Sequence, residues 1–196
     1  MEFKLIEKKA EAGDKDAQCA LGFMYENGKG VEQDYKKAAK WYSKSAKQGD
    51  ADAQVNLGVM YAKGEGVEQN FEAAVKWFKK SADQSNKIAQ VNLGIMYDQG
   101  RGVKKNHKKA FDWYKKSADQ GNAKAQNNLG YMFFNGEGVE QNYQEAFGWW
   151  SKAAEQGHAE AQFNLINKVA QQNKLLMIRY PLSPAAPLQS IITKIK

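Results

Sequence analysis

The chain has 196 residues, of which 29 are basic and 22 acidic, so its formal net charge is +7. Its composition leaves no apolar stretch long enough to span a bilayer, and its single cysteine, Cys19, excludes an intrachain disulfide. Because basic and acidic residues are interspersed, the excess charge is only a weak indication of an acidic partner. We expect a monomeric cytoplasmic protein in a reducing compartment, or one exported by a route that leaves no signal in this chain.

The dominant pattern is a repeat with a period of 36 residues. A Leu-Gly pair, a Gly-x-Gly-Val loop and a tryptophan all recur at this step, the tryptophans being Trp41, Trp77, Trp113 and Trp149. A period in this range is typical of a solenoid, in which each unit buries its apolar face against its neighbours. We therefore predict one elongated domain with a continuous core.

The repeat predicts how the chain is divided. A half repeat at 1–16 aligns with the second half of a unit and acts as a cap. Full repeats follow at 17–52, 53–88, 89–124 and 125–160, and then a capping partial repeat at 161–173, where Ile166 replaces the repeat's glycine. The remaining residues, 174–196, form a proline-containing tail that shares nothing with the repeats.

Each repeat is predicted to contain two helices, because apolar residues recur at steps of three and four. In the second repeat the first helix is expected from 52 to 63 and ends at the Gly-x-Gly loop. The second helices are expected to begin after a capping Asp or Asn, at Asp34, Asn70, Asn106 and Asn142. They should end at a glycine, with Ser85 as the exception, so we expect slight strain in that turn.

A glycine inside each first helix needs a physical reason, since it costs about 1 kcal/mol of helix propensity relative to alanine. The four glycines are Gly22, Gly58, Gly94 and Gly130. We expect each one to make room for an aromatic ring of the second helix in the same repeat, either the tryptophan or its aromatic neighbour.

The repeat unit, Ala-Gln-x-Asn-Leu-Gly-x-Met-Tyr followed by Gly-x-Gly-Val and Ala-x-x-Trp-Tyr/Phe, resembles the Sel-one-like repeat family, a branch of the tetratricopeptide-like solenoids. The resemblance covers residues 1 to about 173 and departs at Ser85, Ile166 and the tail. It implies an all-α fold, a right-handed α/α superhelix of antiparallel helix pairs. It also implies a protein-binding adaptor, scaffold or signalling partner, a class that includes secreted bacterial factors that engage host proteins.

In tetratricopeptide-like solenoids the first helices line a concave groove, so the resemblance places a ligand against residues beside their buried stripe. One asparagine per repeat lies there (Asn56, Asn92, Asn128 and Asn164), next to Val55, Val91, Asn127 and Phe163, and next to Phe23, Val59, Ile95 and Tyr131. The amides could bond the backbone of an extended peptide while apolar neighbours hold its side chains. Alternatively, the asparagines pair with one another or with adjacent backbone and set the repeat register.

The candidate partner-binding residues are Asn56, Val59, Asn92, Ile95, Asn128, Tyr131, Phe134 and Phe163. The aromatic residues among them make the carboxy-terminal end of the groove the best anchor site. The alternative for Phe163 is a place in the core under the tail.

A cysteine-rich bacterial branch of the family has been labelled penicillin-binding or β-lactamase-like, so we considered a hydrolase. None of the eight serines is followed three positions later by a lysine, the spacing that places a base beside the nucleophile. The paired cysteines of that branch are also missing. We therefore expect no catalytic residue.

Other ligand chemistries find little support in the sequence. The basic run Lys104, Lys105, Lys108 and Lys109 makes nucleic acid or another anionic partner an alternative, but solvated charge runs at helix starts are ordinary. His107 stands where the other repeats have Tyr35, Phe71 and Tyr143, so we expect it to fill an aromatic packing slot rather than bind a metal. We predict no metal site and no cofactor.

Overall fold

The computed structural model of the chain describes residues 2–167, and within this range it contains helices and no strands. The helices are α1 (Glu2–Glu11), α2 (Lys15–Asn27), α3 (Tyr35–Lys47), α4 (Ala51–Lys63), α5 (Phe71–Ala82), α6 (Lys87–Gln99), α7 (His107–Asp119), α8 (Ala123–Asn135) and α9 (Tyr143–Glu155). A closing helical segment occupies 159–167. The predicted tail, 174–196, lies outside the described residues. No described helix is both long and apolar enough to cross a membrane.

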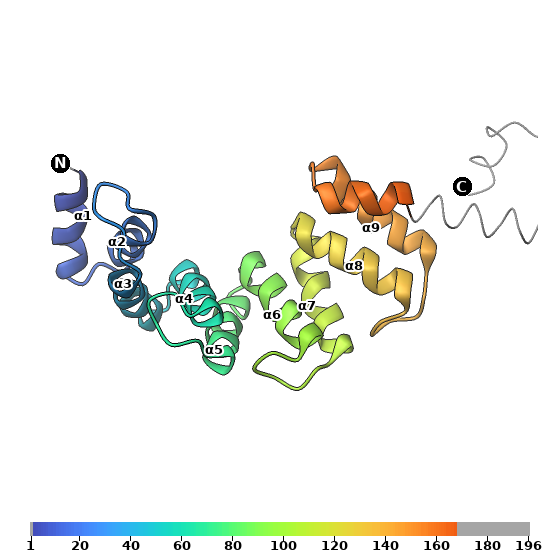
Figure 1. Cartoon of the computed structure of the whole chain (residues 1–196), viewed down its shortest axis with the longest axis horizontal. Coiled ribbons are helices and arrows are strands. Elements are labelled where there is room, and N and C mark those ends of the chain that lie inside the picture. The colour runs from blue at the N-terminus through green and yellow to red at the C-terminus, as the bar shows by residue number, and fades with distance from the viewer. Residues whose placement is uncertain (1, 168–196) are drawn as a thin grey trace, which may run out of the picture.

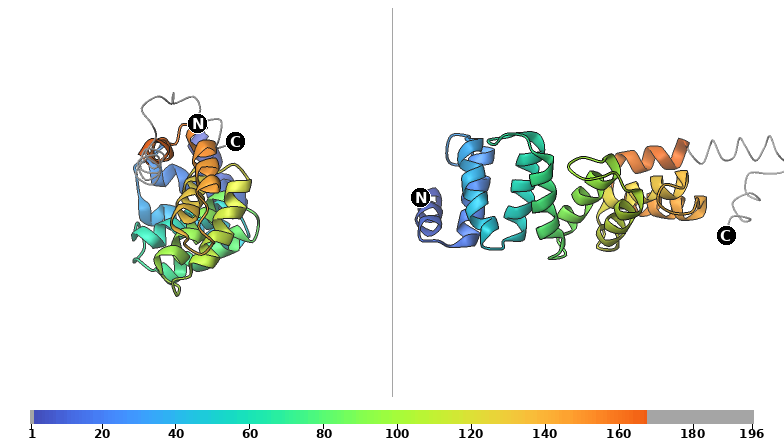
Figure 2. Two further views of the ribbon diagram at one scale, coloured as in Figure 1. Left: turned by 90° about the vertical axis from the view of Figure 1, so that its right-hand side faces the viewer. Right: turned by 90° about the horizontal axis from the view of Figure 1, so that it is seen from below.

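The helices form an all-α solenoid, as predicted. Each first helix packs against the second helix of its own repeat, and each second helix packs against the next first helix along the chain. Figure 1 shows the pairs following one another along an arc, and Figure 2 shows that the molecule is elongated, with α1 and α9 at opposite ends. Helix α1 stands alone as the predicted half repeat, and it packs on α2.

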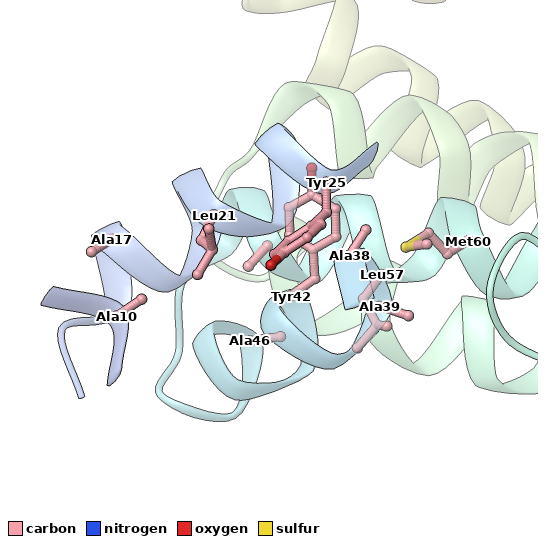
Figure 3. Close-up of a cluster of buried hydrophobic side chains, with 11 residues drawn as sticks. Ala10, Ala17, Leu21, Tyr25, Ala38, Ala39, Tyr42, Ala46, Leu57 and Met60 are labelled. Carbon is pink, nitrogen blue, oxygen red and sulfur yellow. The ribbon is translucent and has the colours of Figure 1, made fainter. Parts of the chain in front are cut away.

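The glycines inside the first helices are explained by close packing, as expected. A Cβ atom built on Gly22 would lie 2.7 Å from the Tyr42 ring, and one built on Gly58 would lie 2.6 Å from the Phe78 ring. Tyr114 and Trp150 fill the same place opposite Gly94 and Gly130. The ring is thus the aromatic neighbour of the repeated tryptophan, and Figure 3 shows Tyr42 between α2 and α3 in the first core cluster.

Buried glutamines join neighbouring repeats, a feature that the sequence analysis did not predict. The Gln54 Nε2 atom donates to the carbonyl oxygen of Ala46 at 3.1 Å, and the Gln54 Oε1 atom accepts from Gln84 at 2.9 Å. The same pair of bonds occurs at Gln18, Gln90 and Gln126. Since buried polar groups must find partners, these bonds fix the position of one repeat on the next.

Buried serines join the two helices inside a repeat. Ser45, Ser81 and Ser117 are fully buried, and their hydroxyls donate to the first residue of the first helix, to the carbonyls of Lys15, Ala51 and Lys87. The distances are 2.7 to 2.8 Å. These three hydroxyls therefore have a structural role and are inaccessible as nucleophiles.

Both ends of the second helices match the predictions. Asp34, Asn70, Asn106 and Asn142 are N-caps whose side chains accept a backbone N–H. The first helices also have N-caps, which we did not predict, at Asp14, Asp50, Asn86 and Asn122. His158 occupies the same position before the closing segment, and its Nδ1 atom accepts from the Ala161 backbone nitrogen at 3.3 Å. His158 thus caps the closing helical segment.

Ser85 is the one non-glycine residue with positive φ among the described residues, at 65°, which confirms the expected strain.

We expect Ser85→Gly to raise the stability of the protein by about 1 kcal/mol, because glycine adopts this left-handed conformation without steric cost. The measurement is the free energy of unfolding in urea. Gly121→Ser, at the equivalent turn with φ 79°, is the matched control and should destabilise by a similar amount. A neutral result for both variants would show that the turn is unstrained.

A candidate partner-binding face on the first helices

The candidate residues lie on successive first helices. Figure 1 shows α4 on the inner side of the arc and α5 on its outer side. Asn56 and Val59 belong to α4, Asn92 and Ile95 to α6, and Asn128, Tyr131 and Phe134 to α8, while Phe163 is in the closing segment. We call the surface formed by these eight residues the first-helix face.

The aromatic residues of this face differ in how much each side chain packs against other rings. Tyr131 makes an edge contact with Trp150, with ring centroids 5.7 Å apart, and Phe134 packs on Trp150 at 5.5 Å and on Tyr143 at 5.0 Å. Both are only half-exposed. Phe163 is 66% exposed. The alternative that it is core under the tail involves residues outside the described range.

Four residues that we expected to lie beside a ligand are buried instead. Val55, Val91, Asn127 and Asn164 are at most 5% exposed. The Asn164 Nδ2 atom donates to Asn127 Oδ1 at 3.1 Å, and the Trp150 indole donates to the Asn127 carbonyl at 3.1 Å. For Asn164, the alternative that the asparagines pair with one another in a structural role is correct. The sequence signal was Asn127 itself, a polar residue at a position that is valine in the two preceding repeats.

Two of the remaining asparagines face a tyrosine hydroxyl. Burial raises the pKa of Tyr42, whose hydroxyl also donates to Glu26 at 2.6 Å, and a hydrogen bond from Asn56 acts in the opposite direction. Burial likewise raises the pKa of Tyr114, with an opposing hydrogen bond from Asn128. The Asn56 and Asn128 amides are therefore held in place by the second helix of the preceding repeat.

Asn92 differs from Asn56 and Asn128 because it has no tyrosine partner. The residue at the position of Tyr42 and Tyr114 is Phe78, which has no hydroxyl. The Asn92 side chain is half-buried and makes no hydrogen bond to any other residue in the described part of the chain. Its amide thus has a free donor and a free acceptor at the middle of the array.

A shallow hollow of about 290 Å³ adjoins the first-helix face at its amino-terminal end. Ile6, Cys19, Ala20, Phe23, Met24, Lys29 and Asn56 line it. Phe23 is 48% exposed, so an aromatic side chain is accessible at this end as well. We noted Phe23 in the sequence but did not select it, because the richest aromatic cluster lies at the other end.

Cys19 is a poor nucleophile in this hollow. Burial raises the pKa of its thiol to about 12, and the negative charge of Asp50 acts in the same direction. The reactive form of cysteine is the thiolate, so this raised pKa disfavours Cys19 as a nucleophile at neutral pH.

The repeated tryptophans lie on the second helices, beside lysines. Trp41, Trp77 and Trp113 are half-buried, and the ammonium groups of Lys44, Lys80 and Lys116 lie 4.0, 4.6 and 4.2 Å from their ring centroids. Cation–π contacts of this kind are modestly stabilising at exposed sites. The tryptophans thus belong to the packing of the second helices and not to the first-helix face.

The fold and this surface together define a class of protein, an α-solenoid that presents a row of polar and apolar side chains along its first helices. A protein-family model for the Sel1 repeat matches residues 15–50, 51–86, 87–122 and 123–158. The chain belongs to the Sel1 repeat family, as the resemblance indicated. No curated protein was found that matches the chain.

The solved structures similar to the chain include a protein with the SLR fold and a Sel1 repeat protein. One is c5321, a protective antigen of uropathogenic Escherichia coli, with 39% identity, a TM-score of 0.79 and coverage of 81% of this chain and 34% of that one. Another is a Sel1 repeat protein from Oxalobacter formigenes, with 38% identity, a TM-score of 0.73 and coverage of 79% and 63%. The Helicobacter pylori cysteine-rich protein B has 26% identity and a TM-score of 0.52, with coverage of 68% and 96%. The chain thus spans about a third of the first and less than two thirds of the second.

Proposed function

We propose that the chain is a non-catalytic scaffold that binds an extended segment of a partner protein along its first-helix face. Sel1 repeat proteins are generally scaffolds for protein–protein interaction, and this supports the proposal at the level of the family. The partner, and the use of this face, are our inference from the side chains.

The observation that carries the proposal is the free amide of Asn92. A half-buried amide without an intramolecular partner can donate to and accept from a peptide backbone without breaking a hydrogen bond inside the protein. The apolar side chains of Ile88, which is 46% exposed, and of Ile95 flank it on the same helix. This combination suits an extended peptide, whose backbone needs hydrogen bonds and whose side chains need apolar contacts.

Exposed aromatic residues at the two ends of the row supply anchors. Phe163 stands at one end together with Ile166, which is 72% exposed, and Phe23 lies in the hollow at the other end. Buried aromatic anchors commonly dominate the free energy of an interface. A hydrolase is disfavoured because Ser45, Ser81 and Ser117 are buried structural groups and Cys19 is protonated.

The test is capture of partners from a lysate of the source organism or its host by the wild type and by the double variant Asn92→Ala, Phe163→Ala. Phe163 is a better choice than Tyr131, because it is exposed and Tyr131 packs on Trp150. We expect the double variant to keep its thermal stability and to bind the captured partner at least about tenfold more weakly.

The matched control is Leu5→Ala, which removes a 57% exposed apolar side chain from α1, a helix that contributes no residue to the first-helix face. It should bind like the wild type. A partner that binds the folded double variant as tightly as the wild type, or that is lost only with Leu5→Ala, would rule out the first-helix face as its site.

A further inference from the structure

A cluster of three potential metal ligands lies where the third and fourth repeats meet. Asp98 is near the end of α6, His107 is the first residue of α7, and Glu137 is in the loop that follows α8. One ligand atom from each side chain lies within 4.8 Å of the other two. The cluster is not visible in the sequence, because its members are separated by 9 and 30 positions along the chain.

Two distances between ligand atoms of the cluster lie on either side of the spacing found around a bound ion. His107 Nδ1 is 2.8 Å from Asp98 Oδ1 and 4.0 Å from Glu137 Oε2. Around a tetrahedral zinc ion, ligand atoms lie roughly 3.4 Å apart, since each is about 2.1 Å from the metal. Small side-chain rotations at these partly exposed residues would bring the three atoms to that spacing.

The backbone holds the cluster together. Gly138, the residue after Glu137, lies so close to the start of α7 that an added Cβ would be 2.5 Å from the carbonyl of His107. Gly66 and Gly102 make the same contact with Tyr35 and Phe71 at the two preceding repeat junctions. The loop therefore contacts the helix start closely at all three junctions between full repeats, and this contact positions the backbone of Glu137 without an ion.

Comparison of the junctions shows that the ligand set is specific to this one. The positions of Asp98, His107 and Glu137 are occupied by Glu26, Tyr35 and Glu65 at the first junction and by Ala62, Phe71 and Arg101 at the second. Neither of these sets contains an imidazole, and the second has no carboxylate. The close backbone contact is shared by the three junctions, but only this junction carries a set of three metal-ligating side chains within the described residues.

We propose that Asp98, His107 and Glu137 bind a divalent transition-metal ion that joins the third and fourth repeats. One imidazole nitrogen and two carboxylates are ligands that Zn²⁺ accepts, with water completing the coordination. His107 was expected only to fill an aromatic packing slot, and its pairing with Asp98 gives it this second role.

The experiment is a calorimetric titration of the full chain with Zn²⁺, together with thermal melts. We expect one ion per chain and a melting temperature that rises with Zn²⁺, because the ion binds only the folded arrangement. His107→Phe, which installs the residue found at position 71, and the isosteric Asp98→Asn and Glu137→Gln should each weaken binding at least about tenfold.

Two further variants remove the other imidazole and the thiol, His158→Asn and Cys19→Val, and both should bind like the wild type. Asn is the capping residue at the positions equivalent to 158 in two other repeats, Asn86 and Asn122, and valine is the residue at 55 and 91. The proposal is overturned if no saturable binding occurs, if all three ligand variants bind like the wild type, or if a control variant loses binding instead. The isosteric variants keep the test valid should His107→Phe fold poorly.

Discussion

Gly58→Ala is expected to destabilise the protein by about 2 kcal/mol, although alanine is favoured over glycine in a helix by about 1 kcal/mol. The reason is steric. The new Cβ would lie 2.6 Å from the Phe78 ring, so the ring or the helix must move within a close-packed core. The measurement is the free energy of unfolding from urea denaturation followed by circular dichroism.

Gly148→Ala is the matched control, since Gly148 lies inside α9 and a Cβ there would meet nothing within 4 Å. It should stabilise the protein by about 0.5–1 kcal/mol through helix propensity alone. In a Phe78→Leu background the added cost of Gly58→Ala should become smaller, because the ring is gone. Equal stability of Gly58→Ala and the wild type would mean that the ring contact does not account for the glycine.

Gln54→Leu is expected to cost about 2 kcal/mol, because it leaves the carbonyl of Ala46 without its donor in the interior. Leucine is similar in size to glutamine, so the substitution removes the hydrogen bonds without opening a large cavity. Gln54 is 4% exposed and also accepts from Gln84, so one change breaks the connection both to the preceding repeat and within its own repeat. Urea denaturation again measures the effect.

The control for this loss is Gln69→Leu. The Gln69 side chain also donates to a backbone carbonyl, that of Ala62 at 2.9 Å, but the bond is exposed and water can replace it. We expect an effect below about 0.5 kcal/mol. Similar losses for the two variants would show that burial of the glutamine contacts contributes nothing to stability.

Local signals determined the helices and their ends. Capping at Asp34 and the left-handed turn at Ser85 depend on residues a few positions apart, so the sequence was sufficient to predict them. The close approach of Gly58 to an aromatic ring was also predictable, since a glycine that weakens its own helix must be offset by packing. The choice of Phe78 rather than Trp77 was not predictable, because it depends on how the second helix is rotated.

The candidate face was predicted only in part. The repeat placed Asn56, Asn92 and Asn128 at equivalent positions and suggested that they are equivalent in role. Their roles differ because Asn56 and Asn128 have hydroxyl partners in the preceding repeat, Tyr42 and Tyr114, whereas the residue at the equivalent position before Asn92 is Phe78, which has no hydroxyl. A repeat alignment compares positions within units and does not compare the contacts between units.

The sequence by itself determined the number of repeats, the helix pairs, the caps of the second helices and membership of the Sel1 repeat family, since all of these follow from a 36-residue period and from short-range residue patterns. The tertiary structure alone decided which polar side chains meet across a repeat junction. It buried Asn164 against Asn127, left the Asn92 amide free and brought Asp98, His107 and Glu137 together. The physical reason is that stacking fixes contacts between side chains about one repeat apart, and these contacts depend on the relative rotation of helices that no local pattern records.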